Sequence, residues 1–301
     1  MPTMTSRYAF LLALVPSLAG AQSLEPRLYL PLPTGLNVIV AAYTHTRGEV
    51  VVEGPLPITD FTATANNVTM AYVRTFGLMG RSAQVQAVMP LVTTTASAKV
   101  AGVDTSRSMA GLADPQLRLA VNLLGGPARS RAEMAAVRLG TIIGASVSVV
   151  PPLGEYFTDR YLNIGAHRWS FKPELGIVQP IAGKWALEGY AGVWLFGDNT
   201  EYLGTKTVSQ EPAWTFQGHI IRVFGRRGYL ALDGTLVRGG STRVDGVVMH
   251  ELQKTVRFGG TGVYSFGRGH ALKGVFSTGV LTRFGGDFDL FSVGYQYSWG
   301  P

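Results

Sequence analysis

The chain has 301 residues, of which 46% are hydrophobic and 15% are charged, and its formal net charge is +7. A mean hydropathy of +0.18 is too high for a disordered protein, and the absence of cysteine excludes disulfides and cysteine-ligated metal sites. The basic residues are dispersed without a basic stripe or a binding motif, so we expect no nucleic-acid partner despite a pI near 9.7.

The first residues have the pattern of a secretory signal peptide. Arg7 precedes an apolar run from Tyr8 to Leu18, and residues 19–21 form an A-x-A cleavage site. The run is shorter than the ~20 apolar residues that a membrane-spanning helix needs. We therefore predict a signal peptide over residues 1–21, export through the secretory pathway, and one domain over residues 22–301 without a helical span.

Turn signals divide the remaining chain into about twelve segments of alternating polarity. The predicted short connections are residues 77–81, 180–183, 225–228 and 267–270. The predicted long connections are residues 47–65, 94–113, 151–167, 197–212 and 239–248.

Outer-membrane barrels alternate short periplasmic turns with longer extracellular loops, and an even strand count places both termini in the periplasm. The pattern predicts an all-β fold, a transmembrane antiparallel β-barrel of about twelve strands. Ten or fourteen strands are possible, because residues 125–133 and 283–288 fit the alternation poorly.

The two faces of these segments differ in polarity. Leu117 and Leu119 alternate with Arg118, for example, and an arginine facing lipid at mid-membrane would cost about 2–4 kcal/mol. The polar side chains are therefore expected to face the lumen. The candidate pore-lining residues are Arg118, Asn122, Arg138, Lys172, Glu174, Glu188, Tyr190, Trp194, His219, Asp233, Arg257 and Lys273. Any one charged member has a simpler explanation as half of a structural ion pair across the lumen.

Two further groups of side chains are assigned to a face of the barrel. Tyr190 and Trp194 share the parity of Glu188 and thus face the lumen. The alternative is that a register slip or bulge places Trp194 and Phe196 in the outer aromatic girdle. Arg74, Arg222 and Lys254 fall on apolar faces near strand ends, where long cationic side chains reach the membrane interface.

Enzymatic chemistry has little support in the sequence. A G-x-S-x-G motif is absent, and His219, the only histidine placed in mid-strand, has no serine assigned to it. The acidic loop residues Asp104, Asp159, Asp198, Glu201 and Asp245 lack the spacing of a calcium loop. We expect no catalytic residue, no metal site and no cofactor.

The last segment carries the clearest signal in the chain. Phe291, Val293, Tyr295, Tyr297 and Trp299 alternate with small or polar residues, which predicts a final strand whose outward face crosses the apolar band of the membrane. This strand is the expected contact with the outer-membrane assembly machinery.

Three stretches resemble a known family: GLADPQLRLAVNLLGGPA at 111–128, PPLGEYFTDRYLNIGAHRWSFKPELG at 151–176, and SVGYQYSW at 292–299. They are similar to the outer-membrane transporter family labelled MetA-pathway of phenol degradation, and the opening RLYLPLPTGLN at 27–37 extends the match. The resemblance implies an outer-membrane β-barrel, distantly like the long-chain fatty-acid channel, that admits aromatic or other hydrophobic compounds. Its expected partners are membrane lipid and a small hydrophobic or aromatic solute.

Three functional hypotheses follow. The inward residues include two more basic than acidic groups, which would favour small organic anions in a passive channel. A structural or adhesive barrel, its lumen filled by its own side chains and by residues 22–34, would show the same strand pattern. An outer-membrane lipid hydrolase would require a serine near His219.

Overall fold

The computed structural model describes residues 24–51, 58–100, 102–134, 139–160, 162–182, 184–248, 253–282 and 285–300. The predicted signal peptide, residues 1–21, lies outside these ranges. No helix within them is long and apolar enough to cross a membrane.

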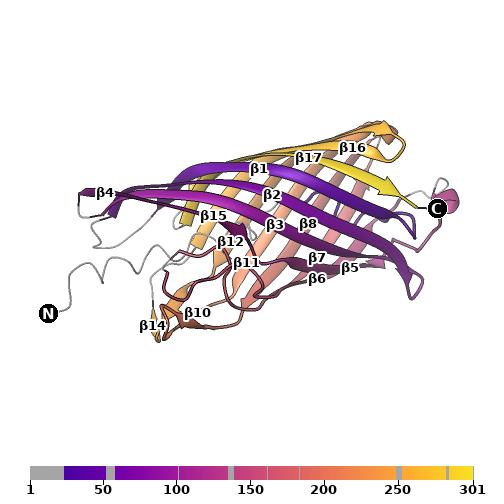
Figure 1. Ribbon diagram of the computed structural model, residues 1–301. Helices are drawn as coiled ribbons and strands as arrows, with labels where there is room; N and C mark the ends of the chain where they lie inside the picture. The colour runs from indigo at the N-terminus through magenta and orange to yellow at the C-terminus, as the bar shows by residue number, and fades with distance from the viewer. Residues whose placement is uncertain are drawn as a thin grey trace.

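Twelve antiparallel strands close into a barrel, which confirms the predicted fold class and strand count (Figure 1). The strands of the wall are β1 (Asn37–Val51), β2 (Ile58–Leu78), β3 (Arg81–Val100), β5 (Gln116–Leu124), β6 (Ile142–Val150), β7 (Ser170–Ile181), β8 (Trp185–Phe196), β11 (Ala213–Val223), β12 (Gly228–Gly239), β15 (Gln253–Gly267), β16 (His270–Thr282) and β17 (Gly285–Trp299). Each strand pairs with the next, and β1 pairs with β17 in a register that places Asn37 opposite Trp299. Closure gives each strand of the wall a paired neighbour on both sides, as a lipid environment requires.

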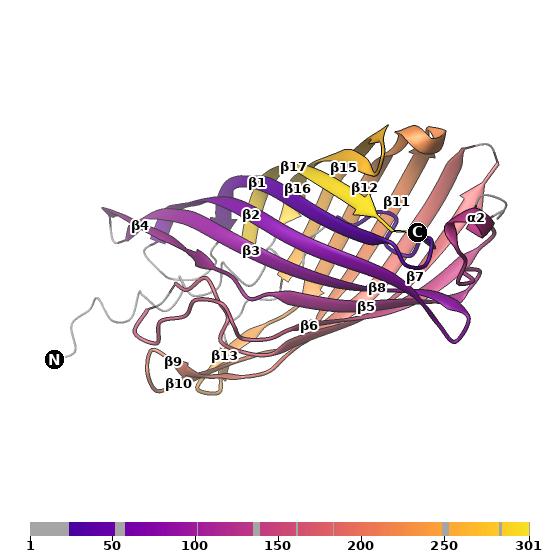
Figure 2. The same cartoon turned by 45° about the vertical axis from the view of Figure 1, so that its right-hand side comes forward.

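The two ends of the barrel differ. The short turns lie at one end, together with Trp299 and the short helix α2 (Arg131–Met134), as Figure 2 shows. The other end carries β4 (Val103–Leu112) and a small separate sheet. The strands of that sheet are β9 (Asn199–Tyr202), β10 (Lys206–Gln210), β13 (Thr242–Val244) and β14 (Val247–Val248). Because barrels of this class have short periplasmic turns, we assign the short-turn end to the periplasm.

The prediction that residues 47–65 and 94–113 are long connections between strands is wrong for most of both ranges. β1 and β2 continue through most of the first range, and β3 and β4 form a hairpin in the second. These strand ends are rich in threonine and serine. Hydroxyl pairs connect them, such as Thr95 Oγ1 on β3 and Ser108 Oγ on β4, which lie 2.8 Å apart. They lack the apolar face of a membrane strand, so the sequence pattern does not reveal them.

The connection between β5 and β6 explains one departure from the predicted alternation. It contains α2, whose first turn is capped because the Ser130 backbone N–H and hydroxyl both donate to Glu133, at 2.7 and 2.8 Å. These hydrogen bonds, with a smaller contribution from Arg129, lower the pKa of Glu133. The connection is longer than the other periplasmic turns because it includes this helix.

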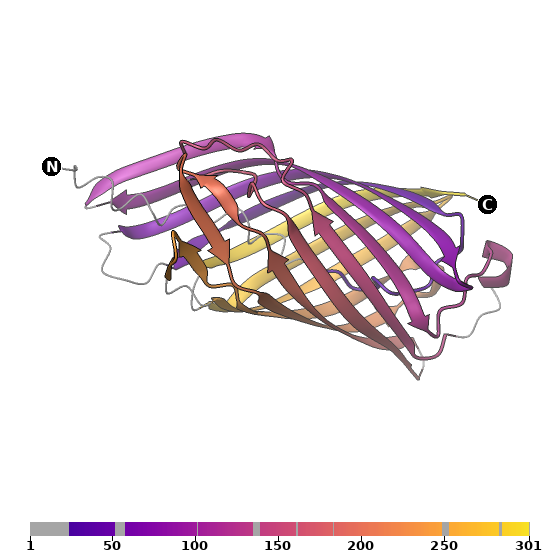
Figure 3. The same ribbon diagram turned by 90° about the horizontal axis from the view of Figure 1, so that it is seen from below.

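The outer surface of the wall is apolar. Leu117 and Leu119, predicted to face lipid, are 50% and 46% exposed, and Leu175 and Ile177 of β7 are 58% and 47% exposed. A continuous apolar surface of this kind on a folded chain indicates contact with a membrane. The tilted strands that carry it are seen from below in Figure 3.

Candidate functional site

The predicted pore-lining residues face the interior of the barrel wherever the structure describes them. Their side chains are buried in the lumen, except that of Lys273, which is half-buried, and their part in solute passage stays a prediction. These residues are Arg118, Asn122, Lys172, Glu174, Glu188, Tyr190, Trp194, His219, Asp233, Arg257 and Lys273. Arg138 lies outside the described residues.

Trp194 belongs to the lumen and not to the outer girdle. Its side chain is 5% exposed and packs with Ala213 and Val237, while Tyr190, two rows nearer the periplasm, is 3% exposed. The strand therefore continues without the register slip that would turn Trp194 outward.

The segment from Leu24 to Thr34 lies inside the barrel, where the indigo trace shows between strands in Figure 3. The Arg27 backbone N–H donates to Glu188 Oε2 on β8 at 2.6 Å, and Gln84 Nε2 on β3 donates to the Leu28 carbonyl at 2.9 Å. Glu25 forms an ion pair with Arg118 on β5. The neighbouring strands β3 and β5 and the more distant strand β8 thus hold this segment, which we call the lumen segment.

Tyr29 is the anchor of the lumen segment. Its side chain is 1% exposed, its hydroxyl lies 3.0 Å from Ser146 Oγ, and its ring meets Tyr190 edge-on at 5.1 Å. Gly144 and Gly176, paired across β6 and β7, form the recess for this ring, because a Cβ at either position would clash with it. Only these glycines allow the tyrosine to approach the wall so closely.

The charges beneath the lumen segment are paired. Lys172 contacts Glu174 at 2.5 Å, and Arg118 donates to Ser148 Oγ at 2.9 Å in addition to its pair with Glu25. A lumen filled by protein requires such partners, because an unpaired buried charge is energetically costly. The candidate residues here hold the lumen segment in the described state.

His219 forms a buried network with the neighbouring strands. Its Nδ1 lies 2.7 Å from Asp233 Oδ1, and Thr261 donates to the other Asp233 oxygen at 2.6 Å. His219 Nε2 has no hydrogen-bond partner in the part of the chain that the structure describes. An aspartate orients this histidine, and no serine hydroxyl is hydrogen-bonded to it among those residues.

A group of aromatic and cationic side chains lies further toward the extracellular end. Trp194 stacks on Phe196 at 6.4 Å, Lys172 Nζ lies 5.8 Å from the Trp194 ring, and the Arg168 guanidinium lies 4.8 Å from the Phe196 ring. We call these four residues the outer aromatic group. Trp194 Nε1 and Arg168 Nε have no hydrogen-bond partner among the described residues.

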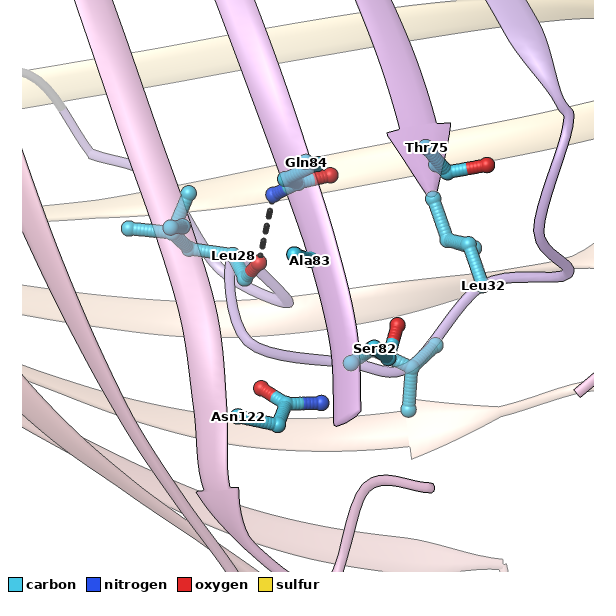
Figure 4. Close-up of a pocket in the computed structure, with 9 residues that line it drawn as sticks. Leu28, Leu32, Thr75, Ser82, Ala83, Gln84 and Asn122 are labelled. Atoms are coloured by element: carbon cyan, nitrogen blue, oxygen red, sulfur yellow. Dashed lines mark hydrogen bonds between the residues drawn. The ribbon is translucent and has the colours of Figure 1, made fainter. Parts of the chain in front are cut away.

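A small cavity separates the lumen segment from β3 and β5 at the periplasmic end (Figure 4). Leu28 and Leu32 line one side, and Gln84 and Asn122 line the other. Its volume of about 10 Å³ has room for roughly one water molecule. The lumen segment therefore packs closely against β3 and β5 at this level.

The wall is incompletely paired at its extracellular end. β16 and β17 are hydrogen-bonded only as far as Ser277 and Leu290. The Arg257 side chain bridges β16 and β17 where their pairing ends, donating to Ser277 Oγ at 2.9 Å and to the Phe288 carbonyl at 2.6 Å. This predicted lumen residue thus stabilises the wall.

The acidic loop residues do not gather into a metal site in the described ranges. Glu201 lies 3.1 Å from His167, and Asp245 accepts from the Thr207 backbone at 2.9 Å.

Sequence reasoning missed the individual residues of the lumen segment, Glu25 and Tyr29 above all. It also missed Arg168 as a member of the outer aromatic group. The only signal for these two residues in the sequence is that a tyrosine, Tyr29, and an acid, Glu25, occur in a short segment before the first strand. Their partners Ser146 and Arg118 are more than 90 residues away along the chain.

The comparisons agree with this geometry. The family described as "Putative MetA-pathway of phenol degradation" matches residues 43–296. An outer membrane channel from Pseudomonas putida F1 is similar at 20% identity and a TM-score of 0.79, over 92% of this chain and all of that one.

Two autotransporter barrels share the fold more distantly. The transport unit of AIDA-I from Escherichia coli has 9% identity and a TM-score of 0.56, over 98% of each chain. The Bordetella BrkA β domain has 11% identity and a TM-score of 0.52, over 88% of this chain and 100% of that one. No protein with a curated description matches the sequence.

Proposed function

The chain belongs to the MetA-pathway phenol-degradation family of outer-membrane barrels, and from this membership we propose that it admits small aromatic or other hydrophobic compounds by passive diffusion. The outer aromatic group is the observation that carries the proposal. Trp194 and Phe196 place flat apolar ring faces inside the lumen, next to the cationic side chains of Lys172 and Arg168. An aromatic solute that enters from outside would stack on these faces.

We further propose a preference for organic anions such as aromatic carboxylates. The described inward mid-strand groups include four cations, Arg118, Lys172, Arg257 and Lys273, against three acids, Glu174, Glu188 and Asp233. Arg168 and Lys172 lie beside the aromatic rings, and Arg168 Nε and Trp194 Nε1 are donors that a carboxylate would satisfy after local rearrangement.

Passage requires the lumen segment to move, because it occupies the lumen at the level of Tyr29. We propose that the barrel alternates between the described closed state and a state with this segment displaced. Solute conductance should then be intermittent.

The test is solute flux into liposomes that contain the refolded protein, comparing benzoate, phenol and benzylamine. Benzoate should enter fastest, and Trp194→Ala should slow benzoate entry, while Tyr264→Ala, on the membrane-facing surface, should not. Cation preference in a planar bilayer at neutral pH would refute the anion preference and leave the channel proposal standing.

The filled lumen also favours a second candidate, a structural barrel that never opens. The two candidates differ in one result. A barrel that shows heat-modifiable migration, and so is folded, but admits none of the three solutes would support the structural role.

A further inference from the structure

Two cationic side chains lie side by side on the membrane-facing surface. Arg238 of β12 and Lys254 of β15 are directly opposite each other in the strand register. Both are exposed, and neither has a hydrogen bond or ion pair with any residue in the described ranges. Side chains in this relation have Cβ atoms about 4.5–5.5 Å apart, where like charges repel.

Three other outward cations near strand ends have an acidic, aromatic or amide side chain beside them. Arg47 lies opposite Asp289 in the strand register, Arg222 lies 5.1 Å from the Trp185 ring, and Arg74 Nη1 donates to Asn37 Oδ1 at 2.7 Å. The Arg238–Lys254 pair differs from these three because each of its cations faces another cation across the strands.

The pair lies at the extracellular boundary of the apolar band. Trp214 of β11, 54% exposed, is opposite Arg238, and Arg222 lies eight residues further along β11 near the periplasmic turn. At about 3.4 Å per residue and a tilt near 40°, eight residues span about 20 Å, close to the height of the apolar band. Arg238 and Lys254 are thus at the level of the outer-leaflet headgroups.

The wall below the pair suits acyl chains. Phe216 lies beneath Trp214, and in the next row Gly189, Gly218 and Gly234 are consecutive cross-strand neighbours on the outward face. A Cβ built on Gly218 would meet nothing within 4 Å. The three glycines have no side chain on this face, with open space at Gly218 and the Phe258 ring beside Gly234, and we call this row the glycine furrow.

We propose that Arg238 and Lys254 bind the phosphate of a phosphorylated lipid of the outer leaflet. A phosphate monoester has close to two negative charges and three acceptor oxygens, so it can bridge both cations and remove their repulsion. Trp214 would contact the headgroup from the side, and the acyl chains would lie over Phe216 and the glycine furrow. Free phosphate would make only the first of these contacts.

The experiment is native mass spectrometry of the refolded mature protein with added bis-phosphorylated lipid A. The wild type should retain the lipid, and the double variant Arg238→Gln, Lys254→Gln should bind it about tenfold or more weakly, since two charge-assisted contacts are lost. The control Arg243→Gln removes an exposed cation that pairs with Glu211 at 2.8 Å beyond the apolar band, and it should bind normally.

Three results would overturn the proposal: unchanged retention in the double variant, equal retention of dephosphorylated lipid A, or displacement of the lipid by millimolar inorganic phosphate. Heat-modifiable migration is measured for each protein, so that loss of binding is scored only for folded barrels. If the double variant does not fold, Lys254→Gln alone should still weaken retention.

Discussion

Replacing Tyr29 with alanine should release the lumen segment. The side chain is 1% exposed and packs against Tyr190 and the glycine recess, so its loss removes both apolar contact and the hydrogen bond to Ser146. Large-to-small substitutions of buried aromatic residues cost about 3–5 kcal/mol. The barrel wall is unchanged by this substitution, so the cost falls on docking of the segment, and the displaced population should rise by about 10² to 10⁴-fold.

The assay uses the absence of cysteine from the chain. A single cysteine in place of Leu28, which borders the small cavity, should react slowly with a soluble maleimide in the parent protein and much faster after Tyr29→Ala. Tyr29→Phe keeps the ring in its recess and is the matched control, for which only a small acceleration is expected. Equal labelling rates in the parent and in Tyr29→Ala would refute the assignment of Tyr29 as the anchor.

Four further outcomes are expected. Glu25→Gln leaves Arg118, 5% exposed, without its charge partner, at a cost of roughly 3–5 kcal/mol, and should increase the frequency of bilayer openings; unchanged gating would contradict this role. Gly176→Val should displace Tyr29 and raise the same labelling rate, whereas Gly274→Val, with open space around its Cβ, should not. Phe258→Arg places a charge on the lipid face opposite Gly234, midway between the levels of Arg222 and Arg238, and should lower the unfolding free energy by about 2–4 kcal/mol. Val247→Arg in the small separate sheet should not, and urea titration in lipid would measure both. Ser130→Ala should raise the pKa of Glu133 part of the way to its ordinary value, because the backbone donor of residue 130 remains, and NMR titration would measure this pKa. Since the pKa of Glu133 is lowered in the folded state, its contact with Ser130 stabilises α2 above the ordinary glutamate pKa. This stabilisation is lost as the pH falls through the lowered value.

The sequence by itself determines the barrel and its two faces. Alternation such as Leu117, Arg118, Leu119 has a period of two, and a membrane penalises a cation on the lipid side, so face and strand follow from local pattern alone. The same argument places Glu188, His219 and Asp233 in the lumen, where the structure has them.

Only the tertiary structure decides what the inward residues contact. The recess for Tyr29 needs Gly144 and Gly176 on adjacent strands, and the partner of Glu25 is 93 residues away. The pairing of Arg238 with Lys254 likewise appears only once the register between β12 and β15 is fixed. Register and lumen filling depend on contacts between distant segments, and these leave no periodic trace in the sequence.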